Sequence, residues 1–281
     1  MELFLIILTL AWLIFASIQD LRTREVANWL TFSLIVFALI YKAFYSVAKN
    51  EWSHFLLALA GFGLFFILAH IFYYGKVFAG GDAKLLMGIG ALLPFEIWGD
   101  YFYLTTTFLF FLFLSGAIYS LVYSALTSVK MSKKFIPAFG KNWRRFRLIW
   151  LIPLIFSIFL FFVKPSLEAW FLISAFFFFL PLAYIYLKSF EEECLIVLLS
   201  PNRLYEGDWL EKDVKIGGKL LRKSIHGLSS KDISFLRSNG KKVWIKQGIP
   251  FVPAFLIAFL IMVFFGSDVS EAIQDLILFL S

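Results

Sequence analysis

The sequence predicts an all-α polytopic membrane protein, with about six to eight transmembrane helices and a small cytoplasmic α+β module. Of its 281 residues, 61% are hydrophobic and only 16% are charged, whereas a soluble domain carries about 25% charged residues. Long unbroken apolar stretches recur along the chain, and a transmembrane barrel would instead show short alternating segments. One long polar region, residues 188–249, interrupts the apolar pattern.

The apolar stretches are long, or nearly long, enough to cross about 30 Å of hydrocarbon as helices. Seven such spans are expected, at 3–19, 29–47, 54–74, 101–127, 148–163, 169–187 and 250–266. A shorter candidate at 83–98 is interrupted by Pro94. If this candidate also crosses, the chain has eight spans and both termini lie outside.

Basic residues lie mostly on one side of this predicted topology. Arg22 and Arg24 follow the first span, and the expected 128–147 loop is strongly basic. Its cations are Lys130, Lys133, Lys134, Lys141, Arg144, Arg145 and Arg147. Because Lys and Arg gather in cytoplasmic loops, this asymmetry predicts a multi-pass protein of the cell membrane with the Asp20 side in the cytoplasm.

Three parts are expected along the chain: a helical bundle at 1–187, a small cytoplasmic module at 188–249, and a final span with an amphipathic tail at 250–281. We interpret the tail from Asp268 to Leu280 as an interfacial or packing helix on the outer side.

Within the polar module, Cys194–Leu199 and the alternating Lys242–Lys246 predict two strands. Ser229 or Ser230 would cap a helix that ends at Asn239-Gly240.

Several classes of protein and site are disfavoured by composition. The single cysteine, Cys194, excludes an intramolecular disulfide framework, and neither it nor the three histidines form a metal-ligand cluster. We therefore expect no cofactor and no metal. The net charge of +7 follows from basic loops at a membrane, so nucleic acid is not an expected partner and the lipid bilayer is.

Two aspartates, Asp20 and Asp82, are the strongest functional signal. Each follows a hydrophobic segment, and both are expected at the same membrane boundary. Charged groups at membrane depth are costly and tend to be functional. Two carboxylates on one face suit aspartyl proteolysis, because one can act as base while its partner stays protonated.

The residues beside Asp82 allow both functional and structural interpretations. Gly80 and Gly81 would let an extended substrate backbone lie close, and Lys84 could bias which carboxylate stays charged. Alternatively, Asp82 is a helix N-cap after a glycine turn, and Lys84 is an interfacial lysine whose ammonium reaches toward water.

These motifs resemble those of a known family. Asp20-Leu-Arg-Thr-Arg-Glu-Val-Ala-Asn28 and Gly80-Gly81-Asp82-Ala-Lys84-Leu-Leu look like the two catalytic-aspartate motifs of type IV prepilin peptidases, membrane aspartyl proteases with a Gly-x-Gly-Asp signature. The polar module and Gly248-Ile-Pro-Phe251 resemble the archaeal branch, which includes preflagellin (archaellin) peptidases. The chain differs at two motif positions, where Ala79 replaces the first glycine and Ala27 replaces a proline.

The resemblance implies an endopeptidase that removes the short basic leader from prepilin-like or preflagellin precursors at the cytoplasmic membrane face. Asp20 and Asp82 would be the catalytic pair, with Asn28 belonging to the first motif. Glu25 and the Glu191–Glu193 run are candidates to accompany the basic leader, although a solvated charge cluster is the more ordinary interpretation of that run. The two aspartates are expected to close fully only around substrate.

Two other functions stay open on the sequence. The same aspartates could bind protons or cations in a small transporter, although no internal repeat is seen and the carboxylates lie at one interface. A scaffold whose basic 128–147 loop binds anionic lipid or a partner is the third possibility.

Overall fold

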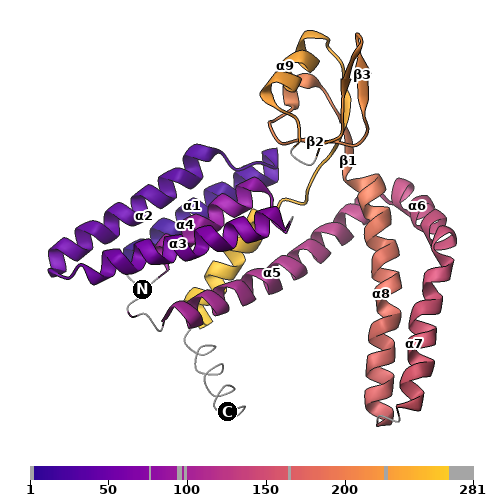
Figure 1. Ribbon diagram of the computed structural model, residues 1–281, viewed down its shortest axis with the longest axis horizontal. Coiled ribbons are helices and arrows are strands. Elements are labelled where there is room, and N and C mark those ends of the chain that lie inside the picture. Colours follow the sequence, from indigo (N-terminus) through magenta and orange to yellow (C-terminus); the bar gives the residue numbers. More distant parts are fainter. Residues whose placement is uncertain are drawn as a thin grey trace. The chain divides into compact units, whose positions relative to one another are not determined.

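The computed structural model describes residues 3–75, 77–93, 97, 100–163, 166–224 and 227–265. The chain forms two units: Met1–Leu121 with Ile249–Ser281, and Val122–Gly248 (Figure 1). Pro94 and the tail from Asp268 to Leu280 lie outside the described residues. The expected part boundaries near 187 and 249 stay predictions.

The first unit is a helical bundle. Its elements are α1 (Leu3–Thr23), α2 (Asn28–Lys49), α3 (Ser53–Tyr74), α4 (Gly80–Leu92), the first part of α5 (Asp100–Lys130), and a helix at Val252–Phe265. Each of the first three expected spans begins within a residue of its predicted start and runs on by up to four residues where it meets water. The apolar pattern therefore predicted these helices well, but not their polar ends.

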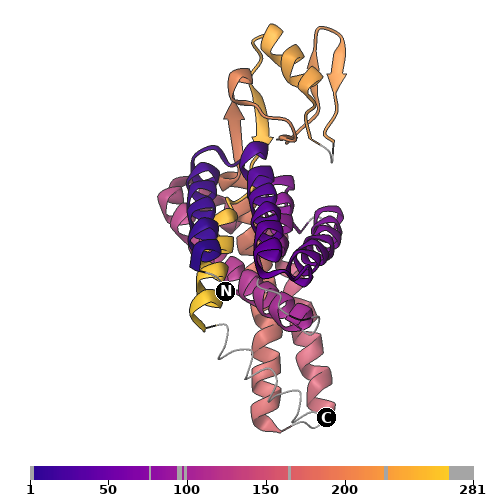
Figure 2. The same cartoon turned by 90° about the vertical axis from the view of Figure 1, so that its left-hand side faces the viewer.

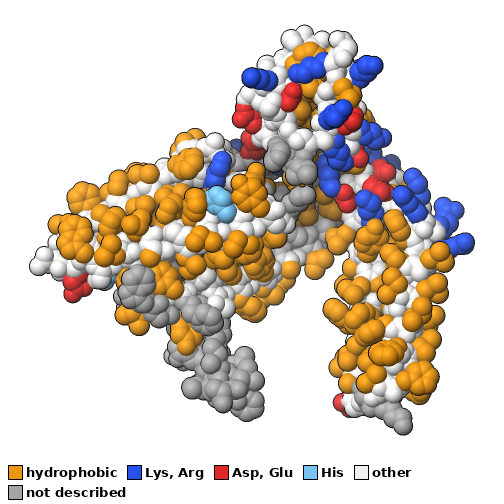
Figure 3. All heavy atoms as spheres, in the orientation of Figure 1, with side chains coloured by type: hydrophobic (Ala, Val, Ile, Leu, Met, Phe, Trp, Pro, Cys, Tyr) orange, Lys and Arg blue, Asp and Glu red, His pale blue; other side chains and the backbone are white. Residues whose placement is uncertain are grey.

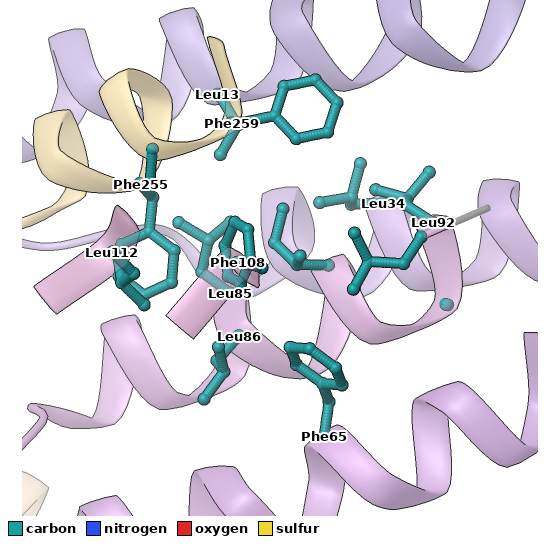
Figure 4. Close-up of a cluster of buried hydrophobic side chains, with 14 of the residues drawn as sticks. Leu13, Leu34, Phe65, Leu85, Leu86, Leu92, Phe108, Leu112, Phe255 and Phe259 are labelled. Atoms are coloured by element: carbon teal, nitrogen blue, oxygen red, sulfur yellow. The ribbon is translucent and has the colours of Figure 1, made fainter. Parts of the chain in front are cut away.

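Helix α4 is the most buried helix of this unit. It packs against α2 and α3, and it lies among these helices in both ribbon views (Figures 1 and 2). Leu85, Leu86 and Ile89 of α4 are fully or almost fully buried. Phe65 of α3 and Phe255 of the Val252–Phe265 helix belong to the same apolar core (Figure 4). The core of the first unit is thus built around the helix that begins at the Gly-Gly-Asp motif.

In the described part of the chain, five helices are long and apolar enough to cross a membrane, at Phe4–Thr23, Asn28–Lys49, Ser53–Tyr74, Tyr103–Lys130 and Leu167–Cys194. A sixth is reached if a bent helix pair, Ser132–Arg145 with Arg147–Phe162, counts as one span. The chain is therefore a polytopic α-helical membrane protein, at the low end of the expected range.

Two of the seven expected long spans differ in the described residues. The one expected at 250–266 is the shorter apolar helix Val252–Phe265, and the one expected at 148–163 belongs to the bent pair. The separate short candidate at 83–98 corresponds to α4, whose 13 residues at 1.5 Å each give about 20 Å, too short for about 30 Å of hydrocarbon. Because the sidedness was inferred from an eight-span count, the cytoplasmic position of the motifs stays a prediction.

The second unit begins with the end of α5 and contains a helical hairpin. Its helices are α6 (Ser132–Arg145), a 3-10 turn η1 (Arg147–Trp150), α7 (Leu151–Phe162) and α8 (Leu167–Cys194). Helices α7 and α8 lie side by side in both views (Figures 1 and 2). The prediction of a loop at 128–147 is wrong, because most of these residues form the helix α6.

The polar module follows α8. Strands β1 (Ile196–Leu199), β5 (Val243–Lys246) and β2 (Trp209–Leu210) form an antiparallel sheet in the order β1-β5-β2. Strands β3 (Val214–Ile216) and β4 (Lys219–Leu221) form a hairpin, and a 3-10 turn η2 (Pro201–Arg203) precedes β2.

Helix α9 (Ser230–Ser238) of this module confirms the predicted cap. The Ser229 hydroxyl accepts a hydrogen bond from the Asp232 amide at 3.3 Å, and the Asp232 carboxylate accepts one from the Ser229 amide. This reciprocal pair satisfies two amides at the helix start. Both predicted strands are also present, as β1 and β5.

Candidate active site

Asp20 lies in the last turn of α1 with its side chain turned into the bundle. The residue is only 6% exposed, and its Oδ2 accepts a hydrogen bond from the backbone N–H of Val252 at 3.0 Å. Val252 is the first residue of the helix Val252–Phe265. The amides of a first helical turn have no partner within the helix, so a carboxylate is a favourable acceptor for them.

The chain turns sharply after Asp20. Arg24 has a positive φ of 58°, and its N–H donates to the carbonyl of Asp20 at 2.7 Å. The side chain of Gln19 accepts a hydrogen bond from the N–H of Ala27 at 3.2 Å, and Ala27 is the N-cap of α2. The turn between α1 and α2 is therefore held by hydrogen bonds to two consecutive residues of α1.

The Ala27 contact explains one of the two motif departures. Ala27 has φ −62°, a value that proline also adopts. Proline has no N–H, however, and would lose the hydrogen bond to Gln19. Alanine is thus the better residue for the turn that this chain forms.

Asp82 is the third residue of α4 and is half-buried. The N-cap is Ala79, so the structural alternative of Asp82 as N-cap is wrong. Its Oδ2 accepts from the N–H of Ala79 at 3.4 Å. Ala79 has an extended backbone with φ −72°, which any residue can adopt, and alanine in place of the signature glycine is not strained.

The structure brings the two motifs together. The charge of Asp20 acts electrostatically on Asp82, and the Nζ of Lys84 donates to Oδ1 of Asn28 at 2.6 Å. A Cβ built on Gly81 would lie 3.7 Å from the Cβ of Val26. Residues 26 and 28 of the first motif thus contact residues 81 and 84 of the second. The ammonium of Lys84 is held between the motifs, and the expectation that it only reaches toward water does not describe it.

Of the proposed acidic partners of a basic leader, Glu191 and Glu192 make contacts within the protein. Glu25 is half-buried, and its backbone carbonyl accepts from the Thr23 hydroxyl at 3.1 Å. Glu191 pairs with Lys188 and Lys246, and Glu192 accepts a hydrogen bond from Asn142. Glu191 and Glu192 therefore stabilise the junction of α8 with α6 and β5, in the second unit.

Two contacts of this site were not predicted from the sequence. Gln19 adjoins Asp20, and a single glutamine at a helix end does not by itself predict a hydrogen bond to the next helix. The amide of Val252 comes from a segment 232 residues away, and its neighbour in sequence, Gly248-Ile-Pro-Phe251, indicates only a resemblance to the archaeal branch. The proline before a helix start was a usable signal, since it predicts free amides just after it.

Comparison with known proteins places the two motifs in one family. Residues 7–123 match the model of the type IV leader peptidase family, and both aspartates lie inside that range. Residues 7–123, which we call the leader peptidase segment, are thus similar to the type IV leader peptidase family. The leader peptidase segment contains α1 to α4 and most of α5.

Curated relatives of the chain include archaeal proteins. The preflagellin peptidase of Methanocaldococcus jannaschii is 37% identical over 82 residues, and those of Methanococcus maripaludis and Methanococcus voltae are 35% and 32% identical over the same length. Each alignment covers 29% of this chain and 35% of the relative. The chain thus spans about a third of the length of the curated relatives it matches.

Proposed function

We propose that the chain is a membrane aspartyl endopeptidase that removes the short basic leader from prepilin-like or preflagellin precursors at the cytoplasmic face of the cell membrane. The observation that carries the proposal is the convergence of the motifs of Asp20 and Asp82 from separate helices, where Lys84 of the second motif donates to Asn28 of the first at 2.6 Å. The archaeal relatives described above are named preflagellin peptidases.

The surroundings of the two carboxylates favour different roles for them. Asp20 accepts the Val252 amide at the start of a helix, and the positive charge of Arg24 acts on it. Burial opposes the ionised form of both carboxylates, but at Asp20 these two contacts favour it. Asp82 accepts a longer hydrogen bond from Ala79 and lies in the field of Asp20. Since two close carboxylates do not both ionise easily, Asp20 is the base and Asp82 the acid.

Peptide cleavage follows from these roles. Asp20 removes a proton from a water molecule, whose oxygen bonds to the carbonyl carbon, while Asp82 donates its proton to the carbonyl oxygen. The tetrahedral adduct then collapses and the C–N bond breaks. The departing amine takes the proton from Asp20, and Asp82 recovers one from the adduct, so the pair ends as it began.

The glycines beside Asp82 support a role in admitting substrate. A methyl group on Gly80 would have its nearest neighbour, Tyr73, at 3.8 Å, and one on Gly81 would meet Val26 at 3.7 Å. These are ordinary contacts, so packing does not demand glycine at either position. Room for an extended substrate backbone next to Asp82 does account for them. The transporter alternative has no observation in its favour.

The test is cleavage of a purified preflagellin or prepilin by the purified chain in detergent. Asp20→Asn and Asp82→Asn should each abolish processing, because asparagine can neither take up nor give the proton. The matched control is Glu51→Gln, which removes an exposed carboxylate of the same unit. Processing at the normal rate by either asparagine variant would exclude the aspartyl mechanism.

A further inference from the structure

Helix α6 carries a basic edge and an apolar edge. With 100° between successive residues, the cations lie on one side and the exposed apolar side chains on the other. The cations are Lys133, Lys134, Lys141, Arg144 and Arg145. The apolar edge consists of Phe139 with Ile136 and Trp143, of which the last two are 66% and 41% exposed. The blue side chains gather over α6 in the space-filling view, next to the apolar surface of α7 and α8 (Figure 3).

The contacts of α6 place it at the end of a membrane-spanning helix. Helix α8 has 28 residues, about 42 Å long, so it exceeds about 30 Å of hydrocarbon and one end must reach the headgroups. Its C-terminal end carries charged residues and continues into the polar module. Asn142 of α6 donates to Ser189 and Glu192 at this end, at 3.1 and 3.0 Å.

The direction of the chain changes where the apolar sequence begins. Helices α6 and α7 are bent by 64° at the short break between them. Helix α7 has exposed apolar side chains, including Ile155 and Phe159, and packs along α8. A bend at this position lets α7 pack along α8 in the hydrocarbon while α6 leaves it.

The cations of α6 are not neutralised by the protein. In the regions that the structure describes, no carboxylate lies within ion-pair distance of Lys133, Lys141 or Arg144. The guanidinium of Arg144 donates to the Gly140 carbonyl of its own helix. A row of uncompensated cations beside exposed apolar side chains, at headgroup depth, matches an anionic lipid surface in both charge and polarity.

We propose that α6 is a membrane-surface helix that binds the phosphate headgroups of anionic phospholipids, with Ile136 and Trp143 inserted at the acyl boundary. The proposal does not depend on the proposed protease activity. A soluble polyanion would pair with the cations but would leave the apolar edge exposed.

The test uses the full chain in neutral detergent and measures lipid binding by native mass spectrometry. Phosphatidylglycerol should bind at least tenfold more tightly than phosphatidylcholine. The variant Lys133→Gln/Lys141→Gln/Arg144→Gln should lose at least tenfold of that affinity, since each cation near an anionic surface contributes about fivefold. The matched control is Lys212→Gln/Lys215→Gln/Lys231→Gln, which removes three exposed cations of the polar module and should change the affinity less than twofold.

A second measurement reports the depth of the apolar edge. The fluorescence of Trp143 is the part of the emission that Trp143→Phe removes. In nanodiscs, lipids brominated close to the headgroup should quench this fluorescence more strongly than lipids brominated near the ends of the acyl chains. Equal binding of both lipids, equal losses in both triple variants, or displacement of the lipid by 10-fold excess inorganic phosphate would each overturn the proposal. So would a Trp143 signal that neither brominated lipid quenches.

Discussion

The close approach of α3 and α4 makes Gly90 a sensitive position in the helix that carries Asp82. A Cβ at Gly90 would lie 2.4 Å from the Cβ of Phe65 and 2.7 Å from the carbonyl oxygen of Gly61. Carbon contacts are ordinarily about 3.5–4.0 Å, so Gly90→Ala requires a shift of roughly 1 Å. One obstacle is backbone, and a rotamer change cannot relieve it. Overpacking of this kind costs about 1–3 kcal/mol.

Two other glycines provide matched controls for Gly90→Ala. At Gly88 the added Cβ meets the end of the Leu34 side chain at 3.0 Å, which can move, and at Gly63 it meets nothing within 4 Å. Thermal unfolding in one detergent should therefore rank the variants with Gly63→Ala most stable, Gly88→Ala intermediate and Gly90→Ala least stable.

Precursor cleavage adds a functional readout to the same series. Because α4 carries Asp82, a displacement of about 1 Å should lower kcat by up to about 100-fold. If Gly90→Ala and Gly63→Ala have the same unfolding temperature and the same cleavage rate, α3 does not pack as closely on α4 as the structure shows.

Three further predictions concern the motif contacts and the polar module. Lys84→Met and Asn28→Ala should each lower kcat/KM. A double-mutant cycle should give a coupling free energy between the two residues of about 0.5–1.5 kcal/mol. Fully additive effects would show that their hydrogen bond is not maintained. Gly81→Ala should leave the unfolding temperature unchanged or higher, because alanine favours helix by up to about 1 kcal/mol, while cleavage falls; unchanged cleavage would contradict the need for space beside Asp82. Burial raises the pKa of Asp208, so the folded module binds more protons than the unfolded chain and loses stability as the pH rises from below 3.8 through the raised value. Asp208→Asn should therefore make the stability of the module depend less on pH. Hydrogen exchange of the β5 amides, corrected for intrinsic rates, measures that stability. If the variant shows an equally steep dependence, another group is responsible for the loss of stability.

The sequence predicted the long helices because continuous apolar stretches in a membrane protein have few alternatives to helix. It also predicted β1, β5 and α9, whose alternation and cap lie within a few neighbouring residues. The β3–β4 hairpin was missed, although Gly217-Gly218 joins its strands with φ of +52° and +85°. A Gly-Gly pair between short alternating segments is a recognised hairpin signal and could have identified it.

Helix α6 was predicted as a loop because local composition opposed a helix there. Pro137 and Gly140 both lie inside it, and each disfavours helix on propensity alone. Packing decides in favour of helix, since Ala138 and Asn142 are buried and Asn142 is bonded to α8. Such a contact joins residues 47 positions apart, and no local sequence pattern predicts it.

Asp20 and Asp82 were identified from the sequence, but the group that orients Asp20 was not. The family match ends at residue 123, and the amide that binds Asp20 belongs to Val252. The segment between them includes the whole second unit. A chain shortened to the matched region would keep both aspartates and lose the Val252 amide, leaving Asp20 buried with one hydrogen bond unmade. The leader peptidase segment therefore contains both carboxylates, and the helix Val252–Phe265 supplies the amide that binds Asp20.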